Sequence, residues 1–281
     1  MFLLIDGPLL VTNKPAGIAT QTIPGLPSLE AAVKQYLRVE GDKTGQVYLG
    51  VPHRLDRPVS GVVVFAKNSK TAARLAEQFR DRTVQKTYWA LVQGLPPESG
   101  HLVDTIRKIP DQPQAELLPP DHPEGKRAEL TFKRLAVFQS ATTATPAPHI
   151  LPAPNNARVP FDFCLLPFDL PASAGAPFSL LEVTLLTGRM HQIRIQLGSR
   201  GWPILNDTLY GGPALPPDML PPLPDLDYGV VTHELDPARG LPITLHARTL
   251  QLKHPIRYDD LTLTAPLPAW WPLPKTFPTA T

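Results

Sequence analysis

Residues 53–66 read His-Arg-Leu-Asp-Arg-Pro-Val-Ser-Gly-Val-Val-Val-Phe-Ala, and this stretch joins a charged turn to an apolar run. A single carboxylate, Asp56, lies between two arginines. Pro58 fixes its own φ and favours an extended residue before it, while Gly61 can adopt dihedral angles that other residues avoid. The β-branched run predicts a buried strand. An acid held in a turn among basic residues suits a nucleophile that meets a polyanion, although short charge clusters are also typical of surface ion pairs.

The composition is typical of a globular protein. The chain has 281 residues, of which 42% are hydrophobic and 19% charged, enough for a large core. One cysteine, Cys164, excludes an internal disulfide and a cysteine-based zinc site. No segment has the roughly 20 apolar residues of a membrane helix, and the first residues lack the basic start of a signal peptide. We therefore expect a cytoplasmic protein if the source is bacterial, with no membrane partner and a monomer as the simplest state.

The charge is unevenly distributed, although the net charge is only +2. Residues 53–88 hold eight basic and three acidic side chains, and residues 186–200 hold three arginines and no acid. Residues 213–240 hold five acidic side chains against one arginine. Positive charge concentrated around two motif segments is typical of a surface that contacts phosphate.

Periodicity along the chain predicts an α+β fold with a mixed, largely antiparallel sheet flanked by helices and loops. Helices are expected after the N-cap candidate Ser28, after Asn68 or Ser69, and over residues 190–197. Pro-rich stretches at about 140–178 and 213–242 are expected to be insertions in a single domain that spans residues 1–281. The expected strands are 9–12, 61–66, 87–92, 127–139, 180–186, 244–252 and 261–265.

Several motifs, taken in order, resemble the RluA-type pseudouridine synthase family. The matching stretches are 13–17 (its lysine–proline loop), 53–61 (its catalytic loop), 86–90 (the strand with its active-site tyrosine), 188–194, 201–211 and 245–255. Each motif alone is weak, but chance matches would not keep this order. The chain departs from the family at Val59, Gln196 and Asn206, where members commonly have Thr, His and Gly. The small RNA-binding domain of many members is not expected before residue 13.

The resemblance implies a pseudouridine synthase fold with a central catalytic cleft, in which uridine in tRNA or rRNA is isomerised without a cofactor. It implies Asp56 as the catalytic carboxylate, acting covalently or as a base, and Arg194 as the guanidinium that orients it, ideally by a bidentate contact. Tyr88 would lie against the target base, although by itself it would be assigned to the core. The implied substrate-binding residues are Arg54, Arg57, Lys14, Arg189 and His191.

Other interpretations remain open at this point. A catalytically inactive RNA-binding or RNA-folding protein is disfavoured because binding alone needs no buried carboxylate. A glycoside hydrolase would need a second acid such as Asp207, but Asn206-Asp207 is typical of a structural turn. No metal site is expected, because His53 and His191 are far apart and no third ligand has suitable spacing. The RNA partner is expected to present its uridine in a loop or bulge, where unstacking costs less.

Overall fold

The computed structural model describes residues 2–42, 44–139, 164–165, 177–221 and 240–273. The helices are α1 (Leu29–Glu40), α2 (Ser69–Arg80) and α3 (Gln192–Gly198), with 3-10 turns η1 (Thr208–Tyr210) and η2 (Pro217–Met219). The strands are β1 (Phe2–Asp6), β2 (Leu9–Lys14), β3 (Ser60–Ala66), β4 (Gln85–Gln93), β5 (Ser99–Lys108), β6 (Ala115–Leu118), β7 (Lys126–Gln139), β8 (Cys164–Leu165), β9 (Pro177–Leu185), β10 (Leu245–Lys253) and β11 (Asp260–Thr264).

These strands form one sheet in the order β1-β2-β3-β10-β4-β9-β7-β5-β6, with β11 beside β10 and β8 beside β7. Two pairings are parallel, β3 with β10 and β7 with β8, and the others are antiparallel. The predicted α+β class and mixed, largely antiparallel sheet are therefore confirmed. The predicted Pro-rich insertions lie mostly outside the described residues.

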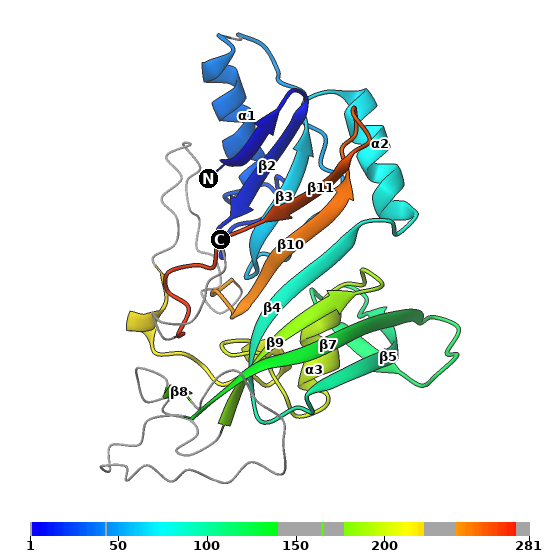
Figure 1. Cartoon of the computed structure of the whole chain (residues 1–281), viewed down its shortest axis with the longest axis vertical. Coiled ribbons are helices and arrows are strands. Elements are labelled where there is room, and N and C mark those ends of the chain that lie inside the picture. The colour runs from blue at the N-terminus through cyan, green and yellow to red at the C-terminus, as the bar shows by residue number, and fades with distance from the viewer. Residues whose placement is uncertain (1, 43, 140–163, 166–176, 222–239, 274–281) are drawn as a thin grey trace.

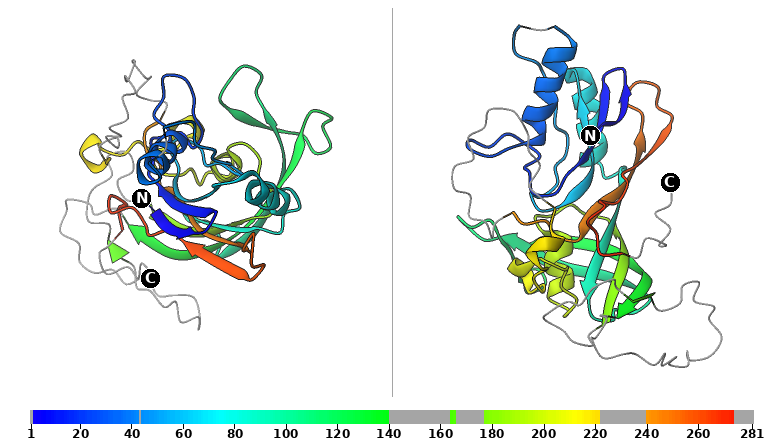
Figure 2. Two further views of the ribbon diagram at one scale, coloured as in Figure 1. Left: turned by 90° about the horizontal axis from the view of Figure 1, so that it is seen from above. Right: turned by 90° about the vertical axis from the view of Figure 1, so that its left-hand side faces the viewer.

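Strand β4 joins two halves of the molecule (Figure 1). It pairs with β10 over residues 85–90 and with β9 over residues 86–93. One half contains β1, β2, β3, β10 and β11 with helices α1 and α2, and the other contains β9, β7 and β5 with α3 (Figures 1 and 2). Side chains that project from β4 therefore lie where the two halves meet.

Local sequence signals set the ends of the two longer helices. The Ser28 side chain accepts a hydrogen bond from the Ala31 N–H, and the Asn68 side chain accepts one from the Thr71 N–H. Both caps satisfy backbone donors that the first helical turn leaves free. Strand β3, which precedes α2, has all seven residues buried, as its apolar run predicts.

Four strands of the sheet, β1, β5, β6 and the two-residue β8, have no counterpart in the prediction. Strand β5 buries only Leu102 and Ile106 completely, so its ten residues show little alternation of apolar and polar side chains. Its sequence pattern does not predict a strand, and its hydrogen-bonded pairing with β7 and β6 stabilises it in the folded protein. Helix α3 begins at Gln192 instead of 190, and β2 continues to Lys14, beyond the expected strand 9–12 and into the stretch that resembles the lysine–proline loop.

Gly61 is required where the catalytic-loop segment enters the sheet. It has φ = 122°, a region that residues with a Cβ rarely adopt. In the parallel pairing of β3 with β10 it lies opposite Ala247. A Cβ at position 61 would collide with the Ala247 carbonyl oxygen and lie 2.5 Å from its backbone nitrogen. The loop that carries Asp56 therefore joins β3 only because residue 61 has no side chain.

We predict that Gly61→Ala lowers the free energy of unfolding by about 3 kcal/mol or more, because backbone strain and steric overlap add. Gly25→Ala is the matched control, since Gly25 also has positive φ (76°) but has open space around its Cβ position. It should cost only about 1–2 kcal/mol. Urea unfolding of both variants checks this, and equal costs would contradict the close approach to Ala247.

Candidate active site

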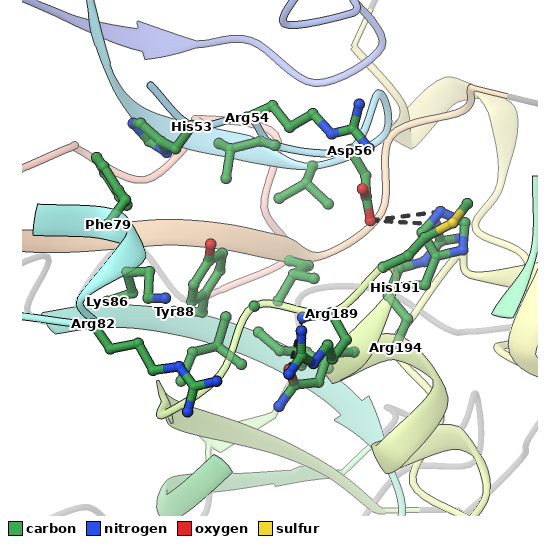
Figure 3. A pocket seen from close by; sticks show the side chains of 18 of the residues that line it. His53, Arg54, Asp56, Phe79, Arg82, Lys86, Tyr88, Arg189, His191 and Arg194 are labelled. Carbon is green, nitrogen blue, oxygen red and sulfur yellow. Dashed lines mark hydrogen bonds and ion pairs between the residues drawn. The ribbon is translucent and has the colours of Figure 1, made fainter. Parts of the chain in front are cut away.

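A cleft of about 460 Å³ opens where the two halves meet. Its walls come from the loop before β3, the end of α2 with the turn after it, strand β4, and the loop that leads into α3 (Figure 3). Asp56 is the only carboxylate among the described residues that line this cleft, whereas several arginines and a lysine line it. The cleft is therefore suited to a polyanionic ligand that brings one reacting group to Asp56.

Hydrogen bonds on both sides of Asp56 fix its loop. The Thr20 hydroxyl donates to the Leu55 carbonyl (2.8 Å) and accepts from the Leu55 N–H (3.0 Å). The Gly17 N–H donates to the Arg57 carbonyl at 2.8 Å. The Asp56 side chain keeps 32% of its surface exposed. Its carboxylate is thus anchored through the backbone and still accessible from the cleft.

Arg194 faces Asp56 across the cleft but is held by a different carboxylate. Its Nη1 lies 3.8 Å from Asp56 Oδ2. Its Nε and Nη2 each donate to an oxygen of Asp207 at 2.7 Å, and both partners are nearly completely buried. Burial alone would lower the pKa of Arg194, but hydrogen bonds and charge from Asp207, with the charge of Asp56, raise it above its usual value. The guanidinium therefore stays charged.

This geometry corrects one sequence-based expectation and adds a role to a second residue. The bidentate contact expected between Arg194 and Asp56 is made with Asp207 instead. Asp207 does precede a turn, as Asn206-Asp207 predicts, but it also neutralises a buried arginine. Both of its oxygens are engaged, so it is a poor candidate for the second acid of a glycoside hydrolase. Among the described residues, the cleft therefore holds one free carboxylate, not a catalytic pair.

His191 lies beside the same carboxylate. Its Nε2 is 3.7 Å from Asp56 Oδ2, and its Nδ1 forms a 2.8 Å hydrogen bond with the Tyr210 hydroxyl. The Tyr210 ring also lies 5.1 Å from the Arg194 guanidinium carbon, in cation–π contact. Burial is the main effect on His191 and lowers its pKa. Tyr210 thus supports both side chains that face Asp56.

Tyr88 projects from β4 into the cleft (Figure 3). Burial, reinforced by the negative charge of Asp56, raises its pKa well above the usual value. The phenol is therefore neutral and can present both a ring face and an O–H group to a ligand. Asp56, Arg194 and Tyr88, the three residues predicted to be catalytic, line one cleft.

The predicted substrate-binding residues divide into two groups. Arg54, Arg189 and His191 line the cleft. Arg57 does not, because its Nε donates to the Gly17 carbonyl at 2.9 Å and its guanidinium packs against Gly240. The contact with the neighbouring loop uses only the Nε donor of Arg57, so the contact of Arg57 with substrate stays a prediction.

Lys14 is also turned away from the cleft. It is fully buried, and its Nζ donates to the carbonyls of Pro15 (3.0 Å), Ile18 (2.7 Å) and Arg57 (3.1 Å). Burial lowers its pKa to about 7, against the smaller raising effect of the Asp56 charge. Lys14 therefore connects the turn after β2 to the Asp56 loop and does not line the cleft, and its contact with substrate stays a prediction.

Sequence reasoning missed four residues at or beside the cleft: Asp207 as a partner of Arg194, Tyr210, Lys86 and Arg82. Strand spacing could have indicated Lys86, because it is two residues before Tyr88 and so on the same face of β4. Arg82 carries no comparable signal.

Within the described residues, no group of three or more His, Cys, Asp or Glu side chains could hold a metal ion. None of the helices described has the length and apolar character needed to span a bilayer.

Comparisons with known proteins agree with this geometry. The profile of a family described as RNA pseudouridylate synthase matches residues 8–199. An uncharacterized RNA pseudouridine synthase of Chloroflexus aurantiacus is 29% identical over 92% of this chain, which spans 62% of that protein. The tRNA pseudouridine synthase C of Haemophilus ducreyi is 29% identical over 95% of this chain and 90% of its own length.

Solved structures support the same fold. Human RNA pseudouridylate synthase domain containing 4 superposes with a TM-score of 0.62 at 22% identity, covering 96% of this chain and 89% of that one. At this identity the likeness concerns the fold. The expected pseudouridine synthase fold is therefore confirmed.

We predict that the buried Lys14 makes stability rise with pH. Between pH 7 and about 10 the unfolded chain keeps a proton on Lys14 that the folded chain has released, so the free energy of unfolding increases by up to about 1.4 kcal/mol per pH unit. Lys14→Met should lose this increase, while Lys133→Met, at an exposed position of β7, should keep it. Urea unfolding from pH 7 to 9.5 checks this, and parallel curves for all three proteins would contradict it.

We predict that Asp207→Ala lowers the free energy of unfolding by about 3–5 kcal/mol, because it leaves the Arg194 charge buried without its partner. Asp260→Ala is the matched control: Asp260 also lies 2.7 Å from its cation, Lys253, but 85% of its side chain is exposed. That change should cost less than about 1 kcal/mol. Thermal and urea unfolding measure both, and similar costs would show that burial of the Arg194 pair does not matter.

Proposed function

The chain belongs to the RNA pseudouridylate synthase family, and from this premise we propose that it isomerises uridine to pseudouridine in tRNA or rRNA. The observation that carries the proposal is the single free carboxylate of the cleft, Asp56, held by its loop and facing the buried Arg194 guanidinium at 3.8 Å. A carboxylate must be ionised to act as a nucleophile or base. The fixed guanidinium at this distance attracts the carboxylate and orients it toward the cleft.

The reaction breaks the bond between the ribose C1′ and uracil N1 and forms a new bond from C1′ to uracil C5. The hydrogen of C5 is lost as a proton, and N1 gains one, so no oxidant, reductant or cofactor is required. Asp56 acts at the junction of sugar and base, either by adding covalently or by abstracting a sugar proton. Arg194 balances its charge in both cases.

Tyr88 and Arg54 are proposed to hold the extruded nucleotide. The ring of Tyr88 provides stacking area for the uracil, and its neutral hydroxyl can share a proton with the base. Arg54 is exposed at the cleft and can contact a phosphate or occupy the space that the base leaves. Because extrusion costs a few kcal/mol from a stack, a uridine in a loop or bulge is the expected target.

An RNA-binding protein without activity is the second candidate, on the same scaffold. Binding alone is served by exposed arginines and does not require a charged arginine–aspartate pair buried behind one accessible carboxylate. The geometry therefore favours the enzyme. A monomer that acts in the cytoplasm remains a prediction from the sequence.

We expect the wild-type protein to release tritium from tRNA or rRNA labelled at uracil C5, and Asp56→Asn to reduce this release at least about 1,000-fold, as expected for an essential nucleophile or base. Asp260→Asn is the matched control, because it makes the same chemical change at an exposed carboxylate outside the cleft. It should keep normal activity.

RNA binding, measured in parallel, distinguishes the two candidates. Asp56→Asn should bind RNA about as well as the wild type. Binding of both RNA pools by the wild type without any tritium release would support the inactive RNA-binding protein and overturn the enzyme.

A further inference from the structure

Three cations converge on one side of the cleft, on the side of Tyr88 away from the Asp56 loop (Figure 3). Arg82 comes from the turn after α2, Lys86 from β4 and Arg189 from the loop before α3. The Lys86 Nζ lies 3.8 Å from the position of a Cβ on Gly188, the residue next to Arg189. Separate elements thus bring these charges together.

Lys86 is a partly buried cation with no counter-charge in the described part of the chain. Among the described residues its ammonium group has no hydrogen-bond or ion-pair partner. Burial, and then the positive charge of Arg82, lower its pKa. Asp56, the single acid of the cleft wall, lies nearest Arg194 and His191. Since an unpaired cation withdrawn from water costs free energy, this position is suited to an anion that arrives with a ligand.

The other two cations also leave donors free. Arg82 has φ = 59°, an uncommon conformation for an arginine, and it places the side chain at the mouth of the cleft (Figure 3). Its guanidinium is exposed and has no partner within the part of the chain that the structure describes. Arg189 donates through Nε to the Arg127 carbonyl at 3.0 Å, which fixes the side chain while its Nη atoms remain available.

We propose that Lys86, Arg82 and Arg189 form a subsite for a phosphate group of the RNA backbone, directly beside the target uridine. Lys86 is two residues before Tyr88 on the same face of β4, which separates their backbones by about 7 Å. A nucleotide whose base stacks on Tyr88 thus brings an adjacent phosphate within reach of Lys86. The planar arginines and the ammonium provide the donors that phosphate oxygens accept. This subsite rests on the proposed function in one respect: the proposed function supplies uracil as the base that stacks on Tyr88.

The test measures RNA binding and its salt dependence in an Asp56→Asn background, so that turnover does not interfere. The probe is a tRNA pool, titrated at KCl concentrations from about 50 to 200 mM. Lys86→Met should weaken binding at every salt concentration and reduce the slope of log K against log salt by about 1, the effect of one lost phosphate contact. Lys86→Arg should restore most of the slope.

Two further variants complete the test, one at a second residue of the subsite and one outside the cleft. Arg82→Asn changes an exposed turn residue, and Asn tolerates its positive φ, so this variant should fold and should also reduce the slope. Lys133→Met is the matched control: it removes one lysine charge from β7, outside the cleft lining, and should leave the slope unchanged.

With Asp56 intact, Lys86→Met should raise the KM for RNA more than it lowers kcat. Slopes for Lys86→Met and Arg82→Asn equal to the parent's would overturn the subsite, whatever the activity. If the wild type releases no tritium but both variants still reduce the slope, the proposed reaction fails and the phosphate contact stands.

Discussion

The arrangement of the cleft depends on the buried ion pair between Arg194 and Asp207. Burying two charges is costly unless their hydrogen bonds are nearly ideal, and here two 2.7 Å bonds meet that condition. Because Nε and Nη2 are used by Asp207, only one edge of the guanidinium is left for Asp56. The ion pair therefore determines where positive charge lies in the cleft. It also keeps Arg194 from forming a bidentate contact with Asp56.

Strand β4 fixes the position of the Arg194 charge relative to the other residues of the site. It is hydrogen-bonded on both sides, to β10 in one half of the molecule and to β9 in the other. The loop of Asp56 belongs to the first half and the helix of Arg194 to the second. The distance between these two side chains is therefore set by the sheet that joins the halves. Lys86 and Tyr88 project from the same strand, and a site built on a strand is held more rigidly than one built on loops.

Much of this organisation could be predicted from the sequence, and the failures have physical causes. Asp56, Arg194 and Tyr88 were predicted to share a cleft because ordered motifs resemble a known family, not because periodicity can show it. Lys14 is assigned to substrate by the family resemblance, and no pattern in the sequence indicates that three carbonyls surround it, since lysine is almost never fully buried. Asp207 is assigned to a turn because Asn and Asp favour such positions, and its ion pair is not visible in the sequence because Arg194 is 13 residues away and pairs with it only after folding.

Synthesis of the chain on the ribosome is constrained by the parallel pairing of β3 with β10. Ser60 bonds to His246, 186 residues later, and the neighbouring Gly61 lies against Ala247. A nascent polypeptide therefore lacks one neighbour of the segment that follows Asp56 until Ala247 has left the exit tunnel. Products of translation that stop before His246 cannot form this parallel pairing, so the wall of the cleft that leads into β3 has one strand neighbour fewer in them.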